Sequence, residues 1–191
     1  MTLLEAPILA QRDPRWGGQR LGNSQFKADG RTPVSSIGAF GCLFMAVVMM
    51  VLTKRQNYTV ENIHGILKEN GIFGQGERGA YFETYYLPLV LGFRTEWISG
   101  KYLKSLMPAD EVARIVAWLR AGKPAVLEVN VLSEPQLRRG GQHFVLGIAA
   151  FGSSANPQIV INDPWYADQT TLAPRFGANA RIGLVRGIMY E

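Results

Sequence analysis

Any covalent chemistry in this chain depends on few side chains, because its 191 residues include one cysteine and two histidines. The cysteine, Cys42, directly follows Gly41 and begins an unbroken apolar stretch that predicts a helix. The N-terminus of a helix presents free N–H groups and a partial positive charge, and both favour a thiolate. Thiols in such positions have pKa values lowered to about 3.5–7.5, so Cys42 is a candidate nucleophile. The alternative is a small core residue, an ordinary role for a cysteine in an apolar helix.

His143 and Asp163 are the candidate partners of this thiol. His143 begins an apolar segment that predicts a strand, and Asp163 ends the next such segment. If the two segments form a hairpin, their outer ends meet and bring the carboxylate near the ring. The carboxylate would then accept a hydrogen bond from Nδ1–H of His143, fix its tautomer and stabilise the imidazolium. The alternatives are an ordinary histidine at a loop edge and an Asn-Asp-Pro turn.

Gln11 is the fourth candidate, although it lies far from Cys42 in the sequence. Its side-chain amide could donate a hydrogen bond to the oxyanion of a tetrahedral intermediate. The second histidine, His64, has no acidic or thiol partner in the pattern, and we expect a structural or solvent-facing role. One cysteine excludes an internal disulfide, and one cysteine with two histidines excludes a Cys₄ or Cys₂His₂ zinc site. We therefore predict neither a metal nor another cofactor.

The charge pattern bears on partners. Lysine and arginine total 20 against 15 acidic residues, a net charge of +5, but the basic residues are scattered and form no stripe. This scatter argues against nucleic-acid binding. Arg138 and Arg139, a few residues before His143, could place positive charge beside the substrate groove. They would then favour acidic or carboxylate-bearing peptides, including the stem peptides of peptidoglycan.

A membrane span is the alternative interpretation of the uncharged stretch between Arg31 and Lys54. Pro33, Gly38 and Gly41 interrupt its first half, so we expect a buried helix instead of a span. The N-terminal residues lack the positive segment and the long apolar core of a signal peptide. We therefore expect a cytoplasmic or virion-associated location.

The remaining pattern changes from helical to extended along the chain. Helical spacing or composition is found at Cys42–Leu52, Thr59–Asn70, 79–91 (in part) and Pro108–Gly122, and strand patterns at 124–132, 143–151, 158–162 and 181–190. Helices followed by strands predict an α+β chain with an antiparallel sheet. We expect one domain spanning residues 1–191, with an irregular N-terminal arm (1–41), a mainly helical lobe (42–122) and a sheet lobe (123–191).

Five short motifs in this order resemble the bacteriocin-processing peptidase-like group of papain-like cysteine peptidases. They are Gln11…Asp13-Pro14-x-Trp16, Gly41-Cys42, Gly122-Lys123-Pro124, Gln142-His143-Phe144 and Asn162-Asp163-Pro164-Trp165. The resemblance extends over nearly the whole chain, from Gln11 to about Gly177. The sequence departs from the pattern at Leu43, where a glycine often follows the cysteine, and in a long insertion between Gln11 and Cys42.

The resemblance implies a papain-like fold, in which the helix bearing the cysteine packs against the antiparallel sheet. It also implies roles for the four candidates: Cys42 as nucleophile, His143 as general acid and base, Asp163 as the residue that orients the ring, and Gln11 as oxyanion donor. Trp165, directly after Asp163-Pro164, would shield the Asp–His bond from water and border the substrate.

These observations predict a cysteine peptidase or amidohydrolase that cleaves a peptide or cell-wall amide through an acyl-thioenzyme. The alternative is a catalytically silent papain-like module that binds a partner or forms part of a larger assembly, such as a virus particle. The net charge of +5 and the lack of a separate substrate-binding domain motivate this alternative. Turnover that is lost with Cys42 would distinguish the two.

Overall fold

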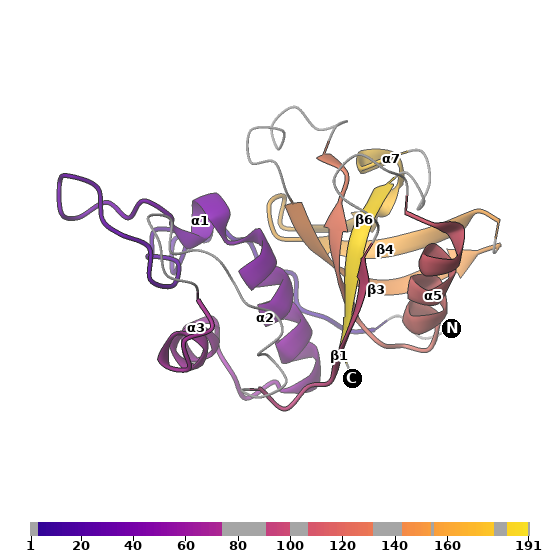
Figure 1. Ribbon diagram of the computed structural model, residues 1–191, viewed down its shortest axis with the longest axis horizontal. Helices are drawn as coiled ribbons and strands as arrows, with labels where there is room; N and C mark the ends of the chain where they lie inside the picture. Colours follow the sequence, from indigo (N-terminus) through magenta and orange to yellow (C-terminus); the bar gives the residue numbers. More distant parts are fainter. Residues whose placement is uncertain are drawn as a thin grey trace.

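The computed structural model describes residues 4–73, 91–99, 107–131, 143–153, 155–177 and 183–190. In chain order its elements are α1 (Ile37–Phe40), α2 (Cys42–Lys54), α3 (Val60–Glu69), β1 (Thr95–Ser99), α5 (Ala109–Arg120), β2 (Ala125–Val129), β3 (His143–Gly152), β4 (Pro157–Asp163), β5 (Asp168–Thr171), α7 (Leu172–Arg175) and β6 (Leu184–Tyr190). Helices α1 to α3 lie on one side of the molecule, and the sheet lies on the other with α5 and α7 (Figure 1).

The strands form one six-stranded sheet in the order β1-β6-β2-β3-β4-β5. Every neighbouring pair is antiparallel. Helices combined with an antiparallel sheet confirm the predicted α+β class. The four predicted strands correspond to β2, β3, β4 and β6, whereas the sequence does not predict the two edge strands, β1 and β5.

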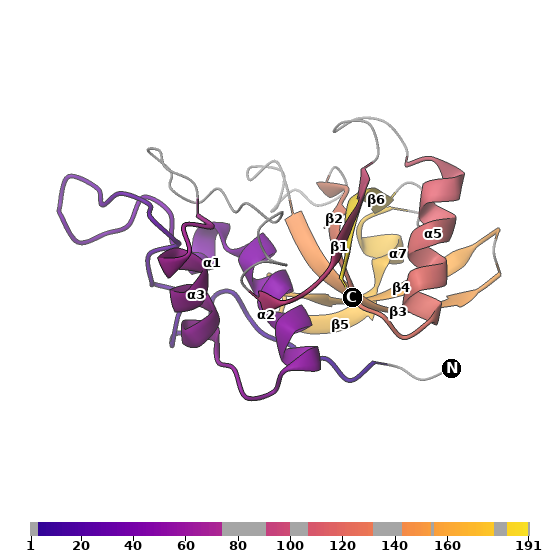
Figure 2. The ribbon, with the colours of Figure 1, turned by 60° about the horizontal axis from the view of Figure 1, so that its bottom comes forward.

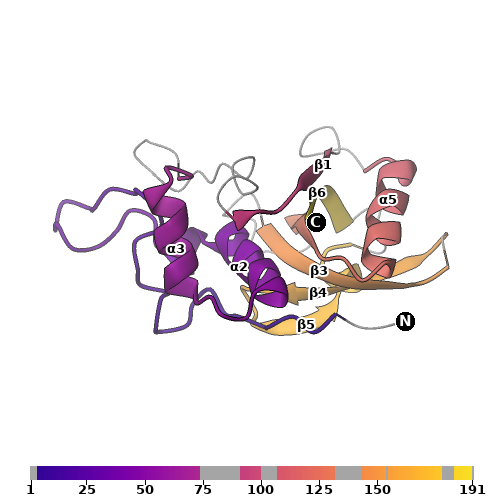
Figure 3. The same ribbon diagram turned by 90° about the horizontal axis from the view of Figure 1, so that it is seen from below.

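Helices α2 and α5 cover opposite faces of the sheet, as Figures 2 and 3 show. Side chains along a strand alternate between the two faces, and β2 illustrates the consequence. Val126 belongs to the apolar cluster around α2, while Ala125 and Leu127 belong to the cluster around α5. Because both faces are covered, every residue of β2 is buried.

Helix α2 is apolar on all sides, and the structure places it in the centre of one cluster. The eight consecutive residues from Phe44 to Val51 are each at most 1% exposed. The helix has 13 residues and is therefore about 20 Å long at 1.5 Å per residue. Among the described residues, no helix has both the length and the apolar character needed to cross a bilayer.

The lobe boundary differs from the predicted one. The range 42–122 contains β1, which pairs with β6 at the edge of the sheet, and α5, which packs on the sheet. The helical side of the molecule, as described, is therefore formed by α1, α2 and α3 alone. Most of the predicted helix at 79–91 lies outside the described residues.

His64, the second histidine, makes structural contacts with the N-terminal arm and with two phenylalanines. Its Nε2 accepts a hydrogen bond from the backbone N–H of Gly22 at 3.0 Å, and its ring packs against Phe44 and Phe73. Burial lowers the pKa of His64, and the charges of Lys68 and Arg20 add to this effect. The neutral ring therefore ties α3 to the N-terminal arm.

Candidate active site

His143 and Asp163 form a buried pair at the ends of two neighbouring strands. His143 is the first residue of β3 and Asp163 the last of β4, and the two strands form the predicted hairpin. Nε2 of His143 lies 2.9 Å from Oδ1 of Asp163, and the two side chains are 1% and 0% exposed. The prediction that Asp163 would bond to Nδ1 is wrong, because the ring presents Nε2 to the carboxylate.

Cys42 reaches the same ring from the opposite lobe. It is the half-buried first residue of α2, and α2 packs on β3, which begins with His143. The thiol lies near enough to the imidazole to interact with it and to raise the pKa of His143. Since Asp163 occupies Nε2, the nitrogen that remains for the thiol is Nδ1. The structure thus brings together three of the four residues that the sequence singles out.

The protonation of His143 follows from these two contacts. Burial alone would lower the pKa of the ring, but the hydrogen bonds and charges of Asp163 and Cys42 outweigh it and raise the pKa to about 9. The ring therefore carries a proton at pH 7. A protonated imidazole has a proton to donate to a leaving group.

Asp163 is itself held by two further donors. The backbone N–H of Trp165 donates to Oδ1 at 2.9 Å, and Nη1 of Arg175 lies 3.4 Å from Oδ2. Arg175 also binds Asp168 with two hydrogen bonds, of 2.8 and 2.6 Å. The carboxylate is therefore fixed on both oxygens, as expected of a residue that orients an imidazole.

Sequence reasoning missed Arg175. Its position follows from β5 and α7, the short elements that return the chain to the end of β4. A weak signal in the sequence was the acidic residue Asp168, which precedes Arg175 by 7 residues and could pair with it.

Gln11 joins the region before Cys42 to the region after Asp163. Its Nε2 donates to the backbone oxygen of Gly38 in α1 at 2.9 Å, and its backbone N–H donates to Pro164 at 2.8 Å. The side chain is 1% exposed. Its Oε1 is buried and has no hydrogen-bond partner within the described part of the chain. The amide therefore lies beside the turn that leads into Cys42.

No known protein-family model and no curated protein matches this sequence. The functional assignment therefore depends on the chemistry of the site alone.

The other predicted substrate-binding residues divide into two groups. Trp165 is half-buried, and the guanidinium of Arg12 lies over its ring, with Cζ 3.6 Å from the ring centroid. Arg138 and Arg139 lie outside the described residues. The positive charge that the structure places next to Trp165 is that of Arg12, which the sequence analysis did not single out.

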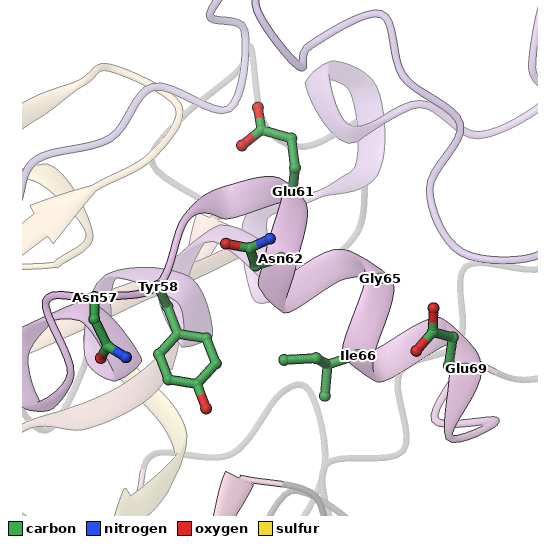
Figure 4. A pocket seen from close by; sticks show the side chains of 7 residues that line it. All are labelled: Asn57, Tyr58, Glu61, Asn62, Gly65, Ile66 and Glu69. Carbon is green, nitrogen blue, oxygen red and sulfur yellow. The ribbon is translucent and has the colours of Figure 1, made fainter.

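A hollow of about 380 Å³ lies along α3 (Figure 4). Its lining consists of Asn57, Tyr58, Glu61, Asn62, Gly65, Ile66 and Glu69. None of these residues is a nucleophile of the kind found at Cys42, and none touches the His143–Asp163 pair in any described contact. Among the described contacts, this hollow is therefore distinct from the cysteine site.

Proposed function

We propose that this chain is a cysteine peptidase or amidohydrolase with a papain-like arrangement of its two lobes. The observation that carries the proposal is the buried His143–Asp163 pair, together with the interaction of the Cys42 thiol that raises the pKa of the His143 ring. A thiol at a helix N-terminus, a protonated imidazole and an orienting carboxylate are the parts that nucleophilic acyl transfer requires.

The reaction would proceed through an acyl-thioenzyme. The Cys42 thiolate attacks the carbonyl carbon of the scissile amide, and the carbonyl oxygen becomes an oxyanion. His143 gives its proton to the amide nitrogen, the C–N bond breaks, and the amine leaves. His143 then takes a proton from water, which attacks the thioester, so that a carboxylic acid is released and the thiolate returns.

Two donors would stabilise the oxyanion in this mechanism. One is the side-chain amide of Gln11, whose Nε2 has a second N–H besides the one that bonds Gly38. The other is the backbone N–H of Cys42, because the first N–H groups of a helix have no partner within it. Donors fixed before the reaction lower the barrier without reorganisation.

The nucleophile can be tested by trapping the acyl adduct. Wild-type protein and the Cys42→Ala variant are incubated with a mixed pool of blocked peptides and muramyl stem peptides, then quenched in acid and digested. We expect an acyl mass on the peptide that contains Cys42, and amide hydrolysis in the wild type alone. Hydrolysis that persists in Cys42→Ala would overturn the mechanism. A stable complex with a pool component in both proteins, without hydrolysis, would favour the binding module instead.

Gln11→Ala tests the oxyanion donor. Loss of one such donor typically reduces kcat by about 10²–10³-fold, and we expect a loss in this range with little change in KM. Iodoacetamide should still alkylate Cys42 at the wild-type rate, because alkylation forms no oxyanion. The matched control is Gln19→Ala, since Gln19 lies on the same arm but is exposed, and among the described contacts its side chain bonds only the backbone of Arg15. An unchanged kcat in Gln11→Ala would exclude the assigned role.

A further inference from the structure

Arg12 and Trp165 form a stacked pair at the edge of the site. The guanidinium carbon of Arg12 lies 3.6 Å from the centroid of the Trp165 ring. Trp165 is fixed to the triad by its backbone N–H, which donates to Asp163. Arg12 directly follows Gln11, which is bonded to the backbone of Pro164. Both members of the stack are therefore held by neighbours that belong to the site.

The charge of Arg12 is available to a ligand. Arg12 is exposed, and no described carboxylate pairs with it. By contrast, Arg15 pairs with Asp13, and Arg175 pairs with Asp163 and Asp168. An aromatic ring covers the face of a guanidinium, while the N–H groups at the edge of the guanidinium can still donate hydrogen bonds. These N–H groups form a planar fork that matches a carboxylate. The stack thus presents an oriented carboxylate-binding group.

The position of this group relates it to one side of the scissile bond. The proton of His143 goes to the leaving amine, so the amine half of the substrate lies on the imidazole side of Cys42. Trp165 is bonded to Asp163, which contacts the same imidazole. These contacts connect the Arg12–Trp165 stack to the imidazole that gives its proton to the leaving amine.

We propose that Arg12, held on the Trp165 ring, binds a carboxylate carried by the leaving amine. The preferred substrates are then amides whose released half bears either a free C-terminal carboxylate or an acidic side chain. This inference rests on the proposed function and specifies its substrate class.

The test uses peptide pools with matched leaving groups. At the first residue after the scissile bond, Asp is compared with Asn, and Glu with Gln. In addition, each peptide is made in two forms, one with a free carboxylate and one with an amide at its C-terminus. We expect wild-type kcat/KM to favour the carboxylate member of one of these pairs. Arg12→Gln should reduce that preference about tenfold, mainly by raising the KM of the carboxylate member of the pair. Which pair loses its preference identifies the source of the carboxylate.

Two control variants separate recognition from folding. Arg12→Lys keeps the charge and should retain part of the preference. Arg15→Gln removes the next arginine of the arm, which lies over Trp16 and pairs with Asp13, and should leave the preference intact. The inference is overturned if Arg12→Gln, folded as judged by its thermal melt, keeps the wild-type preference.

A second measurement needs no turnover. Iodoacetate and iodoacetamide both alkylate Cys42, but iodoacetate carries a negative charge and iodoacetamide is neutral. The ratio of the iodoacetate rate to the iodoacetamide rate therefore reports positive charge near the thiol. Arg12→Gln should lower the ratio of the iodoacetate rate to the iodoacetamide rate about threefold at low salt, and Arg15→Gln should leave this ratio unchanged. If no pool is cleaved but the ratio falls, the proposed peptidase function fails while the anion-binding role of Arg12 stands. An unchanged ratio refutes that role.

Discussion

Replacing Asp163 with asparagine is expected to slow turnover by about 10³-fold or more and to move the alkaline limit of activity to lower pH. The proposed mechanism needs a protonated His143, and the pKa of that ring is raised to about 9, in part by the bond to Asp163. Wild-type activity should therefore fall as the pH rises through about 9. Asparagine removes the negative charge, so the ring loses its proton at a lower pH.

The measurement is the pH profile of kcat/KM between pH 5 and 10. Asp168→Asn is the informative control, because Asp168 shares Arg175 with Asp163 but does not contact His143 in any described interaction. It should leave the alkaline limit near that of the wild type. An alkaline limit that stays in place in Asp163→Asn would show that the carboxylate does not control the ring.

The same proton links the pair to stability. An unfolded histidine titrates near 6.5, whereas folded His143 titrates near 9, so the folded state binds more protons between these values. The contribution of the pair is complete below pH 6.5 and is lost as the pH rises through 9. The difference in urea midpoint between the wild type and His143→Gln should shrink over this window. A constant difference would contradict the raised pKa.

The sequence predicts the positions of His143 and Asp163 because strand ends are marked by local signals. Apolar runs define β3 and β4, and turn residues separate them. Which ring nitrogen meets the carboxylate depends on how the ring is rotated between Asp163 and Cys42. That rotation is fixed by the packing of α2 on β3, a non-local contact that no short motif encodes.

The edge strands show the same limit. β5 (Asp-Gln-Thr-Thr) has no apolar alternation, because neither of its faces is fully buried, and so it carries no strand signal. β1 is short and pairs with β6, about ninety residues later in the sequence. Arg175 depends on β5 for its position, and therefore the second contact of Asp163 could not be predicted either. The papain-like comparison remains a proposal, since the α+β class is shared by many unrelated folds.

Gly41 is expected to be the most sensitive glycine near the site. It separates α1 from α2 by a single residue, and its backbone N–H donates to Ile37 at 2.8 Å. A Cβ at this position would lie 2.9 Å from the Cα of Ile37 and closer still to its carbonyl oxygen. Both are backbone atoms, so no side-chain rotation can relieve the clash. The φ of Gly41 is −86°, and the constraint is therefore close packing and not an unusual backbone angle.

Gly41→Ala should accordingly lower the free energy of unfolding by about 2–3 kcal/mol, the upper part of the range for overpacking. It should also reduce turnover if α1 and α2 separate in a way that moves Cys42, the first residue of α2, away from His143. The matched control is Gly65→Ala in α3, where an added Cβ meets no atom within 4 Å. Alanine is the better helix former, and this variant should gain about 0.5–1 kcal/mol. Urea denaturation of the wild type and of both variants tests this prediction. A urea midpoint of Gly41→Ala equal to that of the wild type would mean that α1 moves aside easily and that Gly41 does not hold the nucleophile in place.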